Sequence, residues 1–300
     1  MSASQPHPPR TLRAGTRGSR LALAQTEWVL ERLRPLLPDT TLEPVVIRTT
    51  GDRSATAPRG TGVFVKEVQE ALRAGDVDLA VHSLKDLPTD PVEGITLAAV
   101  PERADPRDAI VGSRLADLPL GARVGTGSPR RVAQLRRARP DLDVVPLRGN
   151  VPTRVQRVRE GEIDAAVLAA AGLERLGLAA DEILDHDVLL PAPGQGALAV
   201  EVRSTDTALA RVVAALDDAA TRIAVTAERA VLRALGGGCM LPLATLAIVE
   251  DRTLTIHAAA TSADGTRQVR CFSRGARADA HTVAERVASE LESMGARELL

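Results

Sequence analysis

Basic side chains recur where a predicted strand gives way to a predicted helix. Such turns lie at residues 14–20, 125–131 and 147–154, and each carries at least one Arg. The N-terminus of a helix bears a partial positive charge, so an Arg in the first turn costs about 0.3–1 kcal/mol unless an anion compensates it. Backbone N–H groups there already suit an anion, and a guanidinium adds paired hydrogen bonds to a carboxylate or phosphate. A solvated Arg explains any one turn, but three such turns at the carboxyl ends of parallel strands indicate a site for a ligand with several carboxylates.

A carboxylate and an amine follow the apolar run at residues 79–84. Asp86 can act there as a general acid or base, and can stabilise a developing cation, if its surroundings are partly desolvated. Of the 38 Lys and Arg residues, only Lys66 and Lys85 are Lys. In a chain so rich in Arg, a Lys indicates a place for a compact ammonium group. The alternative is an ordinary exposed Lys85–Asp86 pair, and His82 is expected to be packed rather than catalytic.

Cys239 follows three consecutive glycines, which make it a candidate thiolate nucleophile or attachment point. The alternative is a small buried apolar residue, which is the interpretation of Cys271 in its alternating strand. Two cysteines cannot form a disulfide framework, and their separation fits no zinc site. The sequence therefore predicts a protein of a reducing compartment, with no metal site.

Composition argues against several classes of function. The sequence holds no GxxxxGK, GxGxxG, HExxH or GxSxG signature, so nucleotide-dependent chemistry is not expected. A net charge of -1 and 1% aromatic residues disfavour a nucleic-acid-binding protein, which needs a basic surface and aromatic side chains for base stacking. The longest apolar runs are about eight residues, far below the roughly 20 that a membrane span needs. Residues 1–20 lack the apolar core of a secretory signal. We expect a cytoplasmic protein with no nucleic-acid or membrane partner.

The 300-residue chain is long enough for two or three domains. Over its N-terminal two thirds, short β-rich runs alternate with helical patterns, which predicts parallel sheets covered by helices. Strands are expected at 11–14, 45–48, 78–81, 95–100, 123–125, 143–147, 165–170 and 197–203, and helices at 19–34, 64–74 and 129–139. A helix at 221–235, alternating runs at 243–249, 253–260 and 268–272, and a helix at 279–294 predict a small α+β domain with an antiparallel sheet.

A weak internal repeat aligns residues 75–81 with residues 161–167, and both open a buried strand after a helical stretch. One interpretation is that two strands share a start signal by chance. The other is that the chain holds two similar lobes with a crevice between them. Residues 101–108 would then be the first crossover, and the Pro- and Gly-rich residues 190–196 the return. Ala171 and Gly172 match Lys85 and Asp86 in this alignment, so only the first lobe would carry the amine and the acid.

Nine short motifs, in this order and spacing, resemble those of the porphobilinogen deaminase (hydroxymethylbilane synthase) family, from about Leu12 onward. They are TRGS at 16–19, FVKE at 64–67, AVHSLKD at 80–86, DPRD at 105–108, LRGN at 147–150, AGL at 171–173, PGQG at 193–196, TAER at 226–229 and GGC at 237–239. The resemblance implies an α/β fold with two periplasmic-binding-protein-like (type II) lobes, whose doubly wound sheets are mostly parallel, and a smaller C-terminal α+β domain. We expect a disordered tail at 1–10, a first lobe at 11–100 plus about 197–217, a second lobe at 101–196, and a cofactor-attachment domain at 218–300.

The same resemblance implies an enzyme that condenses four porphobilinogen molecules head to tail, losing ammonia each time, and releases hydroxymethylbilane with water. It implies a dipyrromethane cofactor, itself built from substrate and held by a thioether to Cys239. Asp86 would protonate the departing amine and stabilise the pyrrolic cations. The implied cofactor contacts are Ser83, Lys85, Thr126, Ser128, Arg130, Arg131, Arg148 and Gly149. The implied substrate contacts are Arg17, Ser19, Phe64, Arg148, Arg154 and Arg175.

Each pyrrole of such a ligand carries two carboxylates, which agrees with the many Arg residues at strand ends. The sequence departs from the family pattern at Thr61, Gly127, Pro129, Gly236, Met240 and Leu241, which bears on the dynamics of loops rather than on the chemistry. The alternative function is a non-catalytic two-lobe binder of small molecules with several carboxylates. That alternative explains the Arg turns and the repeat, but not the Gly-rich cysteine segment or the third domain. A monomer is expected.

Overall fold

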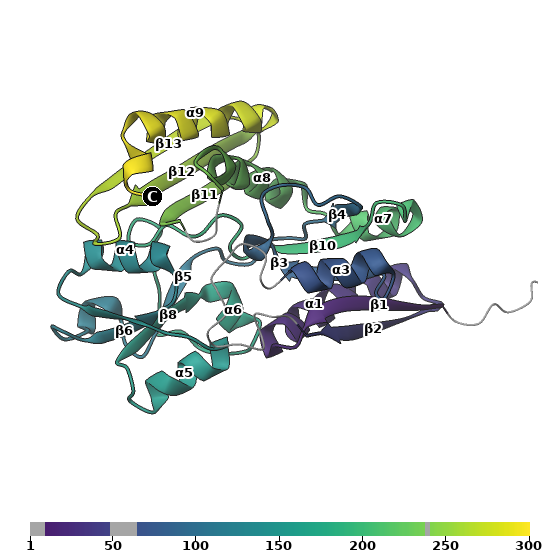
Figure 1. Cartoon of the computed structure of the whole chain (residues 1–300), viewed down its shortest axis with the longest axis horizontal. Helices are drawn as coiled ribbons and strands as arrows, with labels where there is room; N and C mark the ends of the chain where they lie inside the picture. The colour runs from purple at the N-terminus through teal and green to yellow at the C-terminus, as the bar shows by residue number, and fades with distance from the viewer. Residues whose placement is uncertain (1–9, 49–64, 238–240) are drawn as a thin grey trace, which may run out of the picture.

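The computed structural model describes residues 10–48, 65–237 and 241–300. Their strands form three sheets, two of five strands and one of three. In Figure 1 the first five-stranded sheet lies at the right, the second at the left, and the C-terminal sheet above the second. Phe64 and Cys239, as well as Thr61 and Met240 among the departures, fall outside the described residues. So does the expected N-terminal tail, except that Arg10 is already the first residue of a strand.

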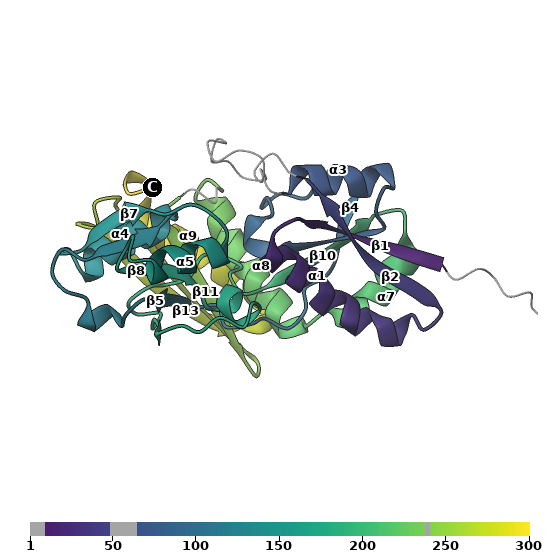
Figure 2. The same ribbon diagram turned by 90° about the horizontal axis from the view of Figure 1, so that it is seen from below.

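The first lobe is built on a sheet with strand order β2-β1-β3-β10-β4, in which β10 runs antiparallel to the other four strands. Its strands are β1 (Arg10–Arg17), β2 (Thr40–Ile47), β3 (Leu79–Ser83), β4 (Ile95–Ala99) and β10 (Leu198–Arg203), and its helices are α1 (Arg20–Leu33), α3 (Lys66–Ala74) and α7 (Thr207–Val213). Side chains alternate between the two faces of β3. Leu79 packs in one cluster with Leu30 of α1, whereas Ala80 packs in another with Leu72 of α3. Figure 2 shows α1 and α7 on one side of this sheet and α3 on the other.

The second lobe repeats this strand order as β7-β6-β8-β5-β9, with β5 as the antiparallel strand. Its strands are β5 (Asp108–Val111), β6 (Arg123–Thr126), β7 (Asp143–Pro146), β8 (Ala165–Ala169) and β9 (Glu182–Ile183), and its helices are α4 (Pro129–Ala138), α5 (Val151–Arg159) and α6 (Ala170–Glu174). Leu135 of α4 packs on one face of this sheet, and Val155 of α5 with Leu173 of α6 on the other. Because β3 and β8 hold equivalent places in the two sheets, the internal repeat reflects two similar lobes.

The antiparallel strand in each lobe arrives from the other lobe. β5 follows β4 through the crossover after Val100, and β10 follows β9 through the Pro- and Gly-rich return. The alternation of strands and helices predicted parallel sheets, which is correct for four of the five strands in each lobe. The predicted fold class, two doubly wound and mostly parallel lobes, is confirmed. The short helices α6 and α7 and the strands β5 and β9 were not predicted.

The C-terminal part contains the antiparallel strands β11 (Leu243–Glu250), β12 (Thr253–Thr261) and β13 (Gln268–Ala276), with α8 (Ala219–Ala234) and α9 (Ala280–Ser293). Val231 of α8 and Val287 of α9 share the core on one face of this sheet. On the other face, Leu246 packs against Leu190, which lies in the return between the lobes. The predicted α+β architecture is confirmed. Among the described residues, no helix is both long and apolar enough to cross a membrane.

Both interlobe connections are fastened to α8 by one buried carboxylate. Glu228 accepts two hydrogen bonds from the Arg103 guanidinium, at 2.7 and 3.1 Å, and one from the Gly194 backbone N–H at 2.6 Å. Its other oxygen also accepts from the Ala247 N–H of β11. The Arg103 side chain in turn donates to the Gln195 carbonyl (2.8 Å). The crossover, the return and the C-terminal part therefore meet at a single node next to the strand ends.

Candidate functional site

Two strand ends of the first lobe carry predicted site residues. Arg17 is the last residue of β1, and Ser19 caps the N-terminus of α1 by accepting a hydrogen bond from the Ala22 N–H (3.1 Å). β3 ends at Ser83, whose hydroxyl exchanges hydrogen bonds with the Gln25 amide at 2.9 and 3.2 Å. Because β1 and β3 are parallel, these residues lie at the same edge of the sheet.

Lys85 and Asp86 lie on the single 3₁₀ turn η2 (Leu84–Asp86) that directly follows β3. Leu84 is fully buried and anchors this turn, while Lys85 and Asp86 are both half-buried. The Lys85 ammonium donates to the Gln195 side-chain oxygen (3.2 Å). Within the described residues, no hydrogen bond or ion pair engages the Asp86 carboxylate. The two residues therefore do not form an ordinary exposed pair, and the Asp86 oxygens are available to a ligand.

The strand ends of the second lobe carry the other predicted turns. Ser128 caps α4 and Pro129 begins it, as predicted, and the Thr126 hydroxyl accepts a hydrogen bond from the Ser128 N–H (3.3 Å). After β7 comes Arg148, which is exposed and has no hydrogen bond or ion pair within the described part of the chain. Gly149 has φ of +110°, and a Cβ there would lie 3.1 Å from the Thr153 side chain, so the tight entry into α5 requires glycine.

Asp108 is the centre of a buried charge cluster in the second lobe. Its carboxylate is fully buried and accepts hydrogen bonds from the Arg130 and Arg131 guanidiniums, both at 2.7 Å, and from the Gln195 amide at 2.8 Å. Burial alone would raise the pKa of Asp108, but the two guanidiniums and these hydrogen bonds hold it far below its usual range. The anion that compensates the Arg residues of the 125–131 turn is therefore internal.

Among the described residues, cations outweigh anions in the environment of Lys85. Burial lowers the pKa of its ammonium to about 8, Arg131 and Arg130 lower it as well, and Asp86 and Asp108 offset only part of this effect. A ligand carboxylate would reverse this loss of charge stabilisation. Gln195 connects the two lobes here, because its oxygen accepts from Lys85 while its nitrogen donates to Asp108.

Replacing Lys85 with Met is expected to stabilise the ligand-free protein at pH 7. The folded-state pKa of about 8 lies below the ordinary value of 10.5, so the unfolded chain binds this proton more tightly and folding is disfavoured below pH 8. The advantage of the variant should shrink between pH 8 and 10.5, because the wild-type amine becomes neutral in the folded state there. Unfolding midpoints at pH 7 and pH 10 measure both effects. Lys66→Met is the control, since that side chain is 77% exposed; a Lys85→Met protein less stable than wild type at pH 7 contradicts the assignment.

Two further guanidiniums are partly desolvated and form no ion pair among the described residues. Arg154 donates from Nε only to the Gly149 carbonyl (2.7 Å), and burial together with Arg131 lowers its pKa to about 10. Arg175 donates to the Gly196 carbonyl (2.8 Å), and burial lowers its pKa as well. Arg103 and Arg222, by contrast, each pair with a carboxylate. Cations that are partly desolvated and have no counter-ion are stabilised when an anion binds, so these side chains can form a binding surface for an anion.

The strand ends of the two lobes approach each other. A Cβ at Gly172, near the start of α6, would lie 3.6 Å from Leu21 near the start of α1. Charge interactions connect Lys85 of the first lobe with Arg130 and Arg131 of the second, and Gln195 accepts hydrogen bonds from both Lys85 and Arg131. Arg154 joins this group through its charge interaction with Arg131. Arg175 lies beside the return next to Gln195. Gly149 joins this group through its carbonyl, which accepts from Arg154 (2.7 Å), whereas no such contact connects Arg148 or Ser19 to it within the described residues.

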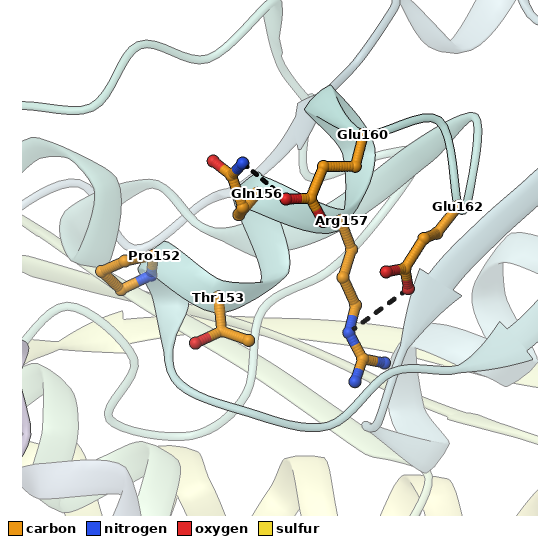
Figure 3. Close-up of a pocket in the computed structure, with 6 residues that line it drawn as sticks. All are labelled: Pro152, Thr153, Gln156, Arg157, Glu160 and Glu162. Carbon is orange, nitrogen blue, oxygen red and sulfur yellow. Dashed lines mark hydrogen bonds and ion pairs between the residues drawn. The ribbon is translucent and has the colours of Figure 1, made fainter.

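A hollow elsewhere on the second lobe does not coincide with these residues. It lies on α5 and the turn after it and is lined by Pro152, Thr153, Gln156, Arg157, Glu160 and Glu162. Figure 3 shows the Arg157–Glu162 ion pair (3.6 Å) and the Gln156–Glu160 hydrogen bond that cross it. None of the six is a predicted site residue, and the carboxylates there already face a cation or an amide.

Sequence reasoning assigned no role to Asp108 or Gln195. Both lie in motifs that carried the family resemblance, DPRD at 105–108 and PGQG at 193–196. Gln195 is fully buried and makes contacts to Lys85, Arg131, Asp108 and the Pro106 carbonyl. The sequence signal that could have found them is a polar residue in a connection between the lobes. That signal does not identify the partners, because they are remote in the sequence.

Comparison with known proteins gives a consistent result over nearly the whole chain. The family model described as porphobilinogen deaminase, dipyromethane cofactor binding domain, matches residues 12–211, and that described as porphobilinogen deaminase, C-terminal domain, matches residues 222–293. A protein of Roseiflexus sp. (strain RS-1) named porphobilinogen deaminase is 50% identical over 300 residues, which cover 97% of this chain and 99% of that protein. A protein of the same name from Acidothermus cellulolyticus is also 50% identical, and the matched residues cover 96% of this chain and 91% of that protein.

Among solved structures, the chain is similar to a putative methionine-binding lipoprotein from Bacillus subtilis. The TM-score is 0.43 and the identity 14%, over 69% of this chain and 90% of that one.

Proposed function

The chain belongs to the porphobilinogen deaminase family, and from that premise we propose that it condenses four porphobilinogen molecules head to tail, losing one ammonia at each step. Hydrolysis then releases the linear product, hydroxymethylbilane, which makes the protein a transferase of tetrapyrrole biosynthesis. The observation that carries the proposal is the group of desolvated cations at the facing strand ends. Lys85, Arg154 and Arg175 have lowered pKa values, and no carboxylate of the described residues lies at salt-bridge distance from them.

These cations fit a dipyrromethane cofactor, because each of its pyrroles carries two carboxylates and the three side chains have no counter-ion among residues 10–48, 65–237 and 241–300. When bound, the group supplies the pyrrole carbon to which the first substrate is joined. We assign its attachment to Cys239 and its contacts to Ser83, Lys85, Thr126, Ser128, Arg130, Arg131, Arg148 and Gly149. Arg130 and Arg131 act mainly through their charge, since Asp108 and the carbonyls of Leu190 and Val167 already accept hydrogen bonds from them.

The substrate and the growing chain bind through cations and polar groups at the remaining strand-end positions. We assign this role to Arg17, Ser19, Arg148, Arg154 and Arg175, and we assign Phe64 to the same ligand as an apolar contact. Asp86 donates the proton that lets the substrate amine leave as ammonia when the aminomethyl C–N bond breaks, and its carboxylate then stabilises the pyrrolic cation. Its lack of a partner among the described residues suits this role, because neither oxygen is committed to a structural contact.

The intact mass of the purified protein tests this proposal directly. Protein expressed with substrate available is expected to carry an added mass equal to two pyrrole units, which Cys239→Ser should lose. Cys271→Ser is the matched control and should keep the adduct: Cys271 is buried, its thiol contacts the Val287 carbonyl, and burial raises its pKa to about 11, so the reactive thiolate is scarce. An unmodified wild-type protein, or ligand binding without ammonia release, would instead favour a non-catalytic binder.

We further propose a domain division that follows the three sheets. The first lobe takes residues 11–100 and about 197–217, the second residues 101–196, and the cofactor-attachment domain residues 218–300. We propose that the protein is a cytoplasmic monomer with porphobilinogen as its small-molecule partner. The free, buried Cys271 agrees with a reducing compartment.

A further inference from the structure

Arg229, near the C-terminal end of α8, reaches across to the turn that bears Lys85 and Asp86. Its guanidinium donates hydrogen bonds to the carbonyls of Leu84 (3.4 Å), Leu87 (3.2 Å) and Pro88. These carbonyls belong to η2 and the two residues after it. The Leu84 carbonyl also accepts from the Leu87 N–H (3.1 Å), whereas no backbone N–H of the described residues donates to the carbonyls of Leu87 and Pro88. A cation at the C-terminal end of a helical turn satisfies such acceptors and interacts favourably with their dipoles.

The environment of Arg229 shows that this contact is its main engagement. The side chain is half-buried, and no carboxylate lies at salt-bridge distance from it among the described residues. Burial lowers the pKa of Arg229, as does the neighbouring Arg233, and the more distant Glu201 and Asp90 offset this only in part. A partly desolvated Arg without an ion pair raises the free energy of the folded protein. Its hydrogen bonds to the three carbonyls offset this cost, and they hold the turn firmly against α8.

A second contact one helical turn later extends the same connection. Arg233 donates to the Thr89 carbonyl and pairs with Asp90 (3.1 Å). Gly237 follows with φ of +55°, and a Cβ there would lie 3.3 Å from the Thr89 hydroxyl. The last turn of α8 and the three residues described after it therefore run along residues 84–90, and in the sequence they lead directly to Cys239.

We propose that Arg229 is a positioning residue that holds the Lys85–Asp86 turn at a fixed place relative to the end of α8, with Arg233 as its auxiliary. The inference rests on the proposed function, because the position of the turn matters for turnover only if Asp86 acts in that reaction. Within the part of the chain that the structure describes, Arg229 itself donates hydrogen bonds only to backbone carbonyls. It acts through Asp86, by keeping that carboxylate aligned with the group attached beyond the end of α8.

The test combines kinetics with local hydrogen exchange. The Arg229→Gln protein is first shown by intact mass to carry the adduct. At saturating porphobilinogen its rate of ammonia release is expected to fall at least tenfold, while its KM stays within twofold of the wild-type value. Amide exchange over residues 84–90 should rise at least tenfold, while exchange over α9 stays unchanged. Arg229→Lys keeps a cation for the carbonyls and should recover part of both losses. A merely structural role would raise exchange throughout the C-terminal part and would not be relieved by Lys.

Arg270→Gln is the matched control, because Arg270 also connects the C-terminal part to a lobe, through Asp187 (2.8 Å), but does not touch the turn. It should keep turnover within twofold. If Arg229→Gln does not fold, Arg233→Gln replaces it. The Arg233 side chain is 53% exposed, and this variant should show a smaller rise in amide exchange over residues 84–90.

The proposal is overturned if the turnover of the Arg229 variant stays within twofold of wild type or if only its KM changes. It is also overturned if amide exchange over residues 84–90 is unchanged in both variants. A wild-type protein without adduct or ammonia release contradicts the proposed function instead, and the exchange measurement still decides whether Arg229 holds the turn.

Discussion

Replacing Asp86 with Asn is expected to lower the rate of ammonia release by about 10²–10⁴, the usual contribution of a positioned general acid or base. Asn keeps the shape of the side chain but can neither donate the proton at the right moment nor carry the negative charge that a pyrrolic cation requires. Asp86 is half-buried and has no partner among the described residues, so the substitution removes no structural contact there. Steady-state release of ammonia from porphobilinogen, with the adduct verified by mass, gives the measurement.

The loss should fall on turnover rather than on KM, because the proposed interaction is with charge that develops in the transition state. Carboxylate recognition belongs to Lys85 and the Arg residues, which the substitution leaves in place. Asp76→Asn is the control, since Asp76 is an exposed carboxylate in the same lobe and should leave turnover unchanged. Near-normal turnover in Asp86→Asn shows that another group moves the proton.

The layout of the fold could be predicted from hydrophobic periodicity, because most elements have their own clear pattern. The helices around Leu30 and Leu135 and the alternating strands of the C-terminal sheet lie where the sequence placed them. β5 was missed because it is a four-residue run, all of it buried, which follows a charged crossover rather than a helix. Its antiparallel direction depends on which lobe the chain comes from, and local pattern carries no information on that.

The site could be predicted only as far as local chemistry reaches. Ser128 and Pro129 are residue types typical of a helix N-terminus, so the start of α4 could be predicted. The gathering of residues at one edge of a sheet could also be predicted, because they follow the ends of parallel strands. The partners of those residues are a different matter. Arg131 and Asp108 are 23 residues apart, and Gln195 and Asp108 are 87 residues apart, so their contacts exist only once the second lobe and the return between the lobes have formed. For that reason the sequence indicated an external anion at a turn where the protein supplies its own.

Replacing Asp108 with Asn is expected to destabilise the folded protein by about 3–5 kcal/mol, the usual result of removing one partner from a buried ion pair. Arg130 and Arg131 are 3% and 6% exposed, and without this carboxylate they remain side by side with no counter-charge. At roughly 2–4 °C per kcal/mol, the thermal midpoint should fall by at least about 6 °C at pH 7. Because the folded-state pKa of Asp108 lies below its ordinary value of 3.8, its contribution is fully present above pH 4 and is lost only as the pH falls further.

The difference between wild type and Asp108→Asn should therefore stay constant from pH 7 to pH 5 and narrow below pH 4. The same substitution removes one of the charges that support the Lys85 ammonium, so the pKa of Lys85 should fall below about 8. Asp105→Asn provides the control: Asp105 pairs with Arg107, whose side chain is 44% exposed, and such a pair contributes about 1 kcal/mol or less. Equal midpoints for Asp108→Asn and Asp105→Asn would mean that the buried guanidiniums find another counter-charge, and the cluster would then not depend on Asp108.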